Sequence, residues 1–294
     1  MRIELKARPP FVLRHVIFSH GWAQLVPFTF QEEPLELRTV DELPGGTVTA
    51  LTITPADGGV AVTSSASLNA AQQDEIASRV SWMLGLDMDF SPFYQLTRSE
   101  PKLAHVEPEG RGRFLRCPTL FEDLVKTIFT TNTQWGATKG MTRRLVEAYG
   151  NPLPEDPALK AFPTPEKLAG VDAAELKDVV RCGYRAPYVV ELAQRIAGGD
   201  LALEAFKNDP RPTAEVRKAL LGIKGVGAYA AANLLMLLGR YDHIPVDTWA
   251  LSLVSQEFHG GQPVGKAEVE AAFAHWDAWQ GLAYWLWKYD SQET

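Results

Sequence analysis

Alternating apolar and polar positions in the first 110 residues predict strands. Thr47–Thr54 alternates with a period of two, and Val60–Thr63 returns after the turn sequence Pro-Ala-Asp-Gly-Gly. Two such runs around a Gly-rich turn are typical of a β-hairpin. A mixed apolar run at residues 11–18 belongs to the same β-rich region. A helix is expected next over Ala70–Leu84, where apolar positions recur at helical spacing.

The pattern becomes helical after the polar, Gly- and Pro-containing segment Glu107–Gly112, which is expected to be a domain boundary. Pro118-Thr119 precedes a helix that begins at Leu120, and Thr164, Asp172 and Thr213 are further helix starts. The other helices are expected at 137–149, 174–181, 186–197, 213–221, 228–238, 247–258, 266–274 and 278–289. The chain is therefore predicted to be α+β, with a β-rich domain at 1–110 and a helical domain at 111–294.

The composition is that of an ordinary globular chain, with 46% hydrophobic and 22% charged residues. No apolar run approaches the roughly 18 residues of a membrane span, and the N-terminus carries no signal-peptide pattern, so we expect a cytoplasmic protein with no membrane partner. The two cysteines, Cys117 and Cys182, cannot by themselves hold an iron–sulfur cluster or a structural zinc ion.

Charge leaves two interpretations open. The net charge of −7 argues against a nucleic-acid partner. However, residues 111–144 carry seven Lys or Arg against two Asp or Glu, whereas residues 30–42 carry five acidic residues against one Arg. The chain could present one basic face on an acidic molecule, or the charges could be an ordinary solvated surface.

The segment Ala219–Asn233 holds the most informative turn, Gly225-Val226-Gly227, between two helical patterns. Glycines allow a tight turn and expose main-chain N–H groups, which at a helix N-terminus suit a DNA phosphate. A dinucleotide-binding turn would need a preceding strand and a third glycine, but position 230 is Ala. A tight helix–helix turn without a ligand is the plainer alternative.

Asp247 follows the apolar Ile244-Pro245-Val246 and stands where a new helix is expected to begin. Its ordinary role there would be that of an N-cap. The same carboxylate could stabilise the positive charge that develops on a sugar when an N-glycosidic bond breaks. The two roles are compatible.

The hairpin, followed 20 residues after Gly227 by Val246-Asp247, resembles the helix-hairpin-helix (HhH-GPD) DNA glycosylase superfamily. Phe114–Asn132 is similar to the first helix of the catalytic domain in the branch that contains the 3-methyladenine and 8-oxoguanine glycosylases. Gly183–Ala186 is similar to a loop of the same branch, and the β-rich residues 1–110 fit its N-terminal sheet domain. The resemblance covers nearly the whole chain.

The resemblance implies that the partner is double-stranded DNA with a damaged base and that Asp247 is the catalytic residue. It assigns DNA contacts to Lys224, Gly225, Val226, Gly227, Asn132, Tyr184 and Arg185. Asn132 would fill the gap left by the flipped base, Tyr184 would wedge at the lesion, and Arg185 would contact the orphaned base. The plain alternatives are a helix C-cap for Asn132, a buried loop aromatic for Tyr184 and a surface cation for Arg185.

Departures from the family pattern narrow the chemistry. Tyr229 stands where strand-cleaving members have a lysine nucleophile, which implies a monofunctional enzyme that uses water. Ala137 and Asn233 replace an arginine that reads cytosine and a cysteine of the oxidised-guanine pocket, which favours an alkylated base. Tyr229, Asn233 and Trp249 are expected to line the base pocket. No cofactor is expected beyond a monovalent cation at the hairpin, and a four-cysteine iron–sulfur motif is absent from the sequence.

The sequence therefore predicts a base-excision-repair glycosylase, active as a monomer, that flips out and removes an alkylated or oxidised purine. Aromatic side chains would stack on the base, with Trp22, Trp249 and the tryptophans at 276–287 as candidates. The main alternative is a non-catalytic helix-hairpin-helix DNA-binding protein. A nucleotide-binding enzyme is a more distant one.

Overall fold

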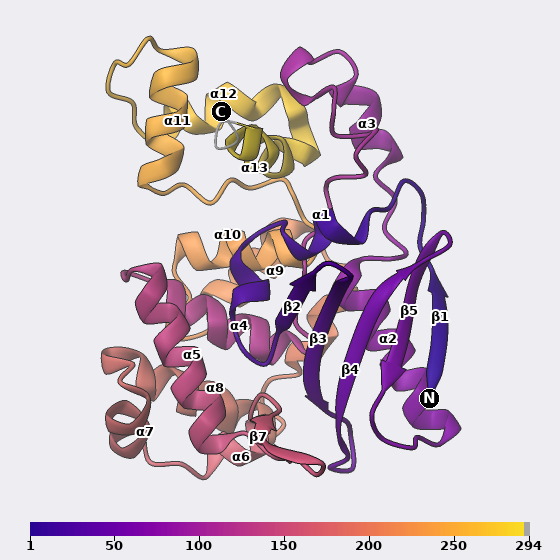
Figure 1. Cartoon of the computed structure of the whole chain (residues 1–294). Helices are drawn as coiled ribbons and strands as arrows, with labels where there is room; N and C mark the ends of the chain where they lie inside the picture. Colours follow the sequence, from indigo (N-terminus) through magenta and orange to yellow (C-terminus); the bar gives the residue numbers. More distant parts are fainter. Residues whose placement is uncertain (291–294) are drawn as a thin grey trace. The chain divides into compact units, whose positions relative to one another are not determined.

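A five-stranded antiparallel sheet, ordered β1-β5-β4-β3-β2, occupies the N-terminal part of the chain in this computed structural model, which describes residues 1–290 (Figure 1). The strands are β1 Arg2–Lys6, β2 Thr29–Glu32, β3 Leu35–Glu42, β4 Val48–Ala56 and β5 Gly59–Ser64. Ala56 pairs with Gly59 across a turn in which Gly58 has a φ of +62°, so the predicted hairpin is confirmed. Leu51 and Ile53 of β4 are fully buried, as the alternating pattern requires.

The predicted helix over Ala70–Leu84 is α2, with the same bounds. Asn69 caps it by accepting from the N–H of Gln72, and Gly85 ends it in the left-handed conformation. Ile76, Val80 and Met83 are fully buried on one face. Figure 1 shows α2 running behind the sheet.

The apolar run at 11–18 is not a strand, which corrects the expectation for that segment. It contains α1 (Leu13–Ile17), whose Leu13, Val16 and Ile17 are all buried. Their spacing of three and four residues puts them on one side of a helix. This spacing, and not the apolar composition of the run, determines the type of element.

The chain forms two compact units, each made of two stretches of sequence. Unit 1 comprises Met1–Met88 and Arg113–Lys207, and unit 2 comprises Asp89–Gly112 and the described residues from Asn208 onward. The expected domains, 1–110 and 111–294, are defined by the change from strands to helices along the sequence. That division of the chain stays a prediction.

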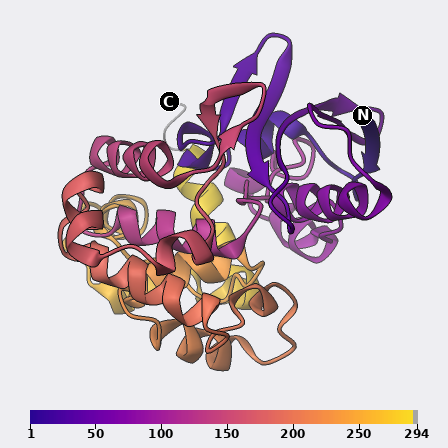
Figure 2. The ribbon, with the colours of Figure 1, turned by 90° about the horizontal axis from the view of Figure 1, so that it is seen from below.

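Unit 1 continues from the sheet into helices. They are α4 Leu120–Thr130, α5 Trp135–Tyr149, α6 Pro165–Ala169, α7 Ala173–Val180 and α8 Ala186–Ala197, with a small hairpin of β6 Pro152–Leu153 and β7 Asp156–Lys160. This hairpin is joined to the large sheet by the buried cluster Val40, Val48, Leu153 and Ala161. Figure 2 shows β6 and β7 beside the hairpin that β3 and β4 form. The sheet and these helices therefore form one packed body.

The regular elements among the described residues of unit 2 are all helices. Its α-helices are α3 Ser91–Thr97, α9 Thr213–Leu221, α10 Ala228–Leu237, α11 Thr248–Phe258, α12 Lys266–Phe273 and α13 Gln280–Asp290. Phe273 and Tyr284 pack edge to face in its core, with ring centroids 5.7 Å apart. No helix among residues 1–290 is long and apolar enough to cross a membrane. Together with the sheet, these helices confirm the predicted α+β class.

Much of the basic stretch at 111–144 lies inside the protein. Arg113 is buried and donates to the main-chain carbonyls of Gly85, Pro10 and Arg8. Arg116 is also buried, and Lys126 is fully buried with its Nζ 2.6 Å from Glu122 Oε1. These three cations bind acceptors inside the protein. They therefore contribute neither to a basic face nor to an ordinary solvated surface.

A second buried acid, Asp123, lies beside this ion pair. Its Oδ1 accepts from Trp22 Nε1 at 2.7 Å and from the N–H of Cys117 at 3.0 Å, while Oδ2 has no hydrogen-bond partner. Burial raises the pKa of Asp123 to about 6, against the opposing effect of the two hydrogen bonds. Compared with the unfolded chain, the folded protein therefore favours the protonated form of Asp123.

We expect the stabilising effect of this proton to be complete below about pH 4 and to be lost as the pH rises through 6. The difference in unfolding free energy between the wild type and Asp123→Asn should fall by about 3 kcal/mol between about pH 4 and pH 8, since each pKa unit is worth about 1.4 kcal/mol. Urea titrations at a series of pH values would measure it. A difference that stays constant with pH would contradict the raised pKa.

Candidate functional site

The Gly225-Val226-Gly227 turn joins α9 to α10, so the predicted hairpin is confirmed. The element before the turn is a helix, whereas a dinucleotide-binding turn would follow a strand. Gly225 has a φ of +88°, which favours glycine, and Val226 is buried beneath the turn. A Cβ on Gly227 would meet no atom within 4 Å, so the main chain is open there. The hydrogen bond from Ala231 N–H to Gly227 O begins α10, which leaves the preceding N–H groups of the turn outside the helix ladder.

Asp247 caps α11, as expected from its position. Its Oδ1 accepts from the N–H of Ala250 at 2.8 Å, and the side chain is half-buried. This bond fixes the carboxylate at the end of the loop that follows α10, in the same compact unit as the hairpin. The cap is therefore confirmed, and a capping carboxylate still has an oxygen available for a substrate.

Two tyrosines lie within electrostatic reach of Asp247. Burial raises the pKa of Tyr229, and the charge of Asp247 raises it further. Burial also raises the pKa of Tyr284, with smaller contributions from Asp247 and Tyr229. Both phenols therefore stay protonated at neutral pH and can donate hydrogen bonds.

Tyr284 is a residue that the sequence analysis did not single out. It lies on α13 and is almost fully buried. The only signal in the sequence was its place in the aromatic-rich tail, where Trp276 and Trp287 are core residues. Its proximity to Asp247 comes from the packing of α13, which no local pattern encodes.

The other expected base-pocket residues lie in unit 2 as well. Asn233 donates from Nδ2 to the main-chain carbonyl of Tyr229 at 2.9 Å, one turn earlier on α10. Trp249 is 39% exposed in the first turn of α11, whereas Trp22 is buried in unit 1. Of these candidates for stacking, Trp249 is the accessible one. The pocket roles of Tyr229, Asn233 and Trp249 stay predictions.

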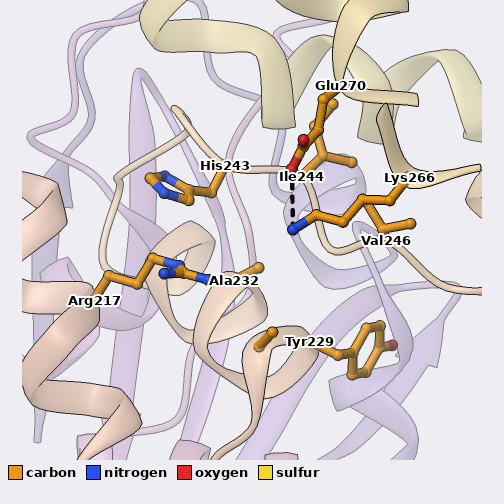
Figure 3. Close-up of a pocket in the computed structure, with 9 residues that line it drawn as sticks. Arg217, Tyr229, Ala232, His243, Ile244, Val246, Lys266 and Glu270 are labelled. Atoms are coloured by element: carbon orange, nitrogen blue, oxygen red, sulfur yellow. Dashed lines mark ion pairs between the residues drawn. The ribbon is translucent and has the colours of Figure 1, made fainter. Parts of the chain in front are cut away.

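A cavity of about 350 Å³ opens within unit 2 beside the hairpin helix (Figure 3). It is lined by Arg217, Ala228, Tyr229, Ala232, His243, Ile244, Val246, Lys266 and Glu270. Lys266 and Glu270 point toward one another, with an Nζ–Oε1 distance of 3.3 Å. The cavity thus borders the first turn of α10 and the segment that carries Asp247.

Asn132, Tyr184 and Arg185 lie together in unit 1. Asn132 follows α4 with a φ of +45° and donates from Nδ2 to Tyr184 Oη at 3.3 Å. Tyr184 is 51% exposed, so the alternative of a buried loop aromatic is wrong. The C-cap of α4 is Thr131, one residue before Asn132. The structure therefore pairs the two side chains that the family resemblance assigns to the lesion.

Arg185 is 7% exposed, so it is not a surface cation. Its guanidinium donates to the main-chain carbonyls of Thr131 and Cys182 and lies 4.6 Å from the ring centre of Tyr184. In this conformation it braces the turn that carries Asn132. Its contact with an orphaned base stays a prediction.

Among the described residues, no three Asp, Glu, His or Cys side chains lie close enough together to hold a metal ion. A cation at the hairpin would use main-chain carbonyls and stays a prediction.

Residues 125–277, more than half of the chain, match the model of the family described as HhH-GPD superfamily base excision DNA repair protein. A DNA-3-methyladenine glycosylase of Bacillus subtilis (strain 168) is 26% identical over 223 residues, which cover 74% of this chain and 73% of that protein.

Two solved structures share the fold over the whole chain. A 3-methyladenine DNA glycosylase from Archaeoglobus fulgidus has a TM-score of 0.76 at 20% identity and covers 100% of this chain and 99% of its own. An 8-oxoguanine glycosylase/lyase of Clostridium acetobutylicum, in complex with double-stranded DNA containing cytosine opposite 8-oxoguanine, has a TM-score of 0.74 at 21% identity, with coverages of 100% and 98%. The sheet followed by a helical core is thus the fold of these structures.

Proposed function

The chain belongs to the HhH-GPD superfamily of base excision DNA repair proteins, and on this premise we propose that it is a monofunctional DNA glycosylase that removes a damaged purine. The observation that carries the proposal is the placement of a capped, half-buried Asp247 in the same compact unit as an open Gly225-Val226-Gly227 turn. The open turn suits a DNA phosphate, and the carboxylate of Asp247 suits the cleavage of a glycosidic bond.

The hairpin would hold the DNA backbone through main-chain N–H groups of the turn and the first turn of α10. Such contacts need little side-chain charge, because the helix N-terminus itself attracts an anion. Lys224, which is exposed beside the turn, would add a cation near a phosphate. This mode of binding accommodates the net charge of −7.

Asp247 would act once the damaged nucleotide has left the base stack. The bond between C1′ and the base nitrogen breaks, and its electron pair leaves with the base. The carboxylate stabilises the positive charge that remains on the sugar and accepts a proton from the water that attacks C1′. The Ala250 N–H keeps the carboxylate in place, so little reorganisation is needed during the reaction.

Tyr229 supports hydrolysis by water over attack by an enzyme amine. A protonated phenol at this position has no nucleophilic nitrogen and cannot form the Schiff base that leads to strand cleavage. The phenols of Tyr229 and Tyr284 would instead donate hydrogen bonds near Asp247. The expected product is an abasic site in an intact strand.

The substrate class that we favour is an alkylated purine. Alkylation makes the ring electron-deficient, so it stacks well on an aromatic side chain such as Trp249. The relative from Bacillus subtilis is named a DNA-3-methyladenine glycosylase, which supports this choice. An oxidised purine is the second candidate, because an 8-oxoguanine glycosylase/lyase shares the fold.

A panel of duplexes, each with one alkylated, oxidised or deaminated base, tests the proposal. Mass spectrometry of the released base should detect an alkylated purine, and release from the other duplexes should be slower. DNA binding without release of any base would replace the proposal with a non-catalytic DNA-binding protein. Release of only the oxidised or deaminated base would contradict the substrate class.

A further inference from the structure

Three arginines lie on α5 and at the end of α7 in unit 1, where Arg143 and Arg181 are exposed and Arg144 is half-buried. We call Arg143, Arg144 and Arg181 the arginine cluster. Arg144 on α5 donates from Nε to the carbonyl of Val180 at 2.7 Å, which ties it to the end of α7, where Arg181 is the C-cap. Burial lowers the pKa of Arg144, and the charges of Arg181 and Arg143 lower it further. Arg144 is thus close enough to both Arg181 and Arg143 for their charges to repel its own.

This repulsion is poorly compensated by acidic side chains. Arg143 pairs with Glu147 at 3.0 Å, but both side chains are more than half exposed, so water screens the pair. Among the side chains that the structure describes, no carboxylate lies within ion-pair distance of Arg144 or Arg181. Of the basic residues at 111–144, Arg143 and Arg144 therefore remain available for a partner, unlike the buried Arg113, Arg116 and Lys126.

Arg181 also has an unfavourable backbone conformation. Its φ of +57° and ψ of +38° place it in the left-handed region, which glycine or asparagine adopts most readily at the end of a helix. A residue with a Cβ and a long charged side chain stabilises the fold less than glycine at this position. The charge of Arg181 is favourable at the C-terminus of α7, but its left-handed backbone is not, and the long side chain is left exposed for a polyanionic partner.

Arg181 connects the cluster to the loop with the side chains that the proposed function brings to the lesion. Arg181 precedes Tyr184 by three residues, and α5, which carries Arg143 and Arg144, begins three residues after Asn132. A duplex that reaches Tyr184 would pass its sugar–phosphate backbone over this surface. Guanidinium groups bind phosphodiester oxygens with paired, charge-assisted hydrogen bonds.

We propose that the arginine cluster is a second DNA-binding site, which takes phosphodiester groups of the duplex beside the Asn132–Tyr184 pair. The proposal rests on the proposed function for its ligand, and it adds side-chain cations in unit 1 to the main-chain contacts at the hairpin. Each phosphate contact releases counterions, so the cluster also makes binding depend on salt.

The variant Arg181→Gly separates this role from a structural one. Its backbone strain is relieved, so its urea midpoint should rise, while its affinity for a lesion duplex should fall about 5- to 20-fold. The slope of log K against log salt should become shallower by about 0.9. Arg181→Lys should recover most of the affinity. Arg195→Ala removes the same charge from the last turn of α8 and should change neither affinity nor slope.

An unchanged affinity and salt slope in Arg181→Gly would overturn the proposal, as would an equal loss in Arg195→Ala. Single-turnover base release at saturating enzyme should be the same for Arg181→Gly and the wild type, because Asp247 is untouched. Loss of affinity in a protein that releases no base would retain the binding site and reject the glycosylase proposal. The two proposals can therefore fail separately.

Discussion

Replacing Asp247 by Asn should lower the rate of base release at least about 100-fold, the size of effect expected when a preorganised electrostatic group is removed from an active site. Asn caps helices about as well as Asp, so the bond to the Ala250 N–H is retained and α11 should be unaffected. DNA affinity should stay within about threefold of the wild type, because the hairpin contacts do not involve the carboxylate. Single-turnover kinetics and fluorescence anisotropy measure the two quantities.

Asp172→Asn is the matched control for this variant. Asp172 caps α7 through the N–H of Ala174 at 2.8 Å, in unit 1. The same substitution at the same kind of position should leave base release unchanged. Equal turnover in Asp247→Asn and the wild type would remove Asp247 from the mechanism, whatever the control shows.

Removing Glu122 should have the largest effect on stability. Lys126 is fully buried, and Glu122 is its hydrogen-bonded anion at 2.6 Å. Glu122→Ala would leave a buried ammonium group without this partner, at a cost of about 3–5 kcal/mol in unfolding free energy. Urea titration followed by tryptophan fluorescence would measure the loss.

The double variant Glu122→Leu with Lys126→Met tests the cause of that loss. It replaces the ion pair by apolar side chains of similar size, so most of the stability should return. A double variant as unstable as Glu122→Ala would show that the loss arises from packing and not from the uncompensated charge.

Helices with clear ends were predictable from the sequence. The bounds of Ala70–Leu84 and Ala186–Ala197 match exactly, since the first starts after the Asn69 cap and both end at a glycine. The hairpin was equally visible, because Gly225-Val226-Gly227 stands between an amphipathic helical pattern and an alanine-rich one. The local cap of Asp247 followed from its place before a helix.

Features that depend on long-range packing were not predictable. Strand β2 is four residues long and exposed throughout, so it has no buried alternating face, and its strand character comes from pairing with β3. Strand β1 does alternate between polar and apolar residues, but over only five positions, and it is completed by pairing with β5. The burial of Arg185 was foreseen neither by the expected base contact nor by the surface-cation alternative, because it depends on the main-chain carbonyls of Thr131 and Cys182 that accept from its guanidinium. The proximity of Tyr284 to Asp247 likewise arises only when α13 packs in unit 2.

Hydrolysis by water is tested most directly by a single-turnover reaction of the wild-type protein with a duplex that carries one alkylated purine, analysed with and without alkali. The expected products are free alkylated base and full-length strands before alkali, with cleavage at the lesion only after alkali treatment and in proportion to the base released. Strand nicks before alkali would contradict hydrolysis by water. No released base would contradict the glycosylase function itself.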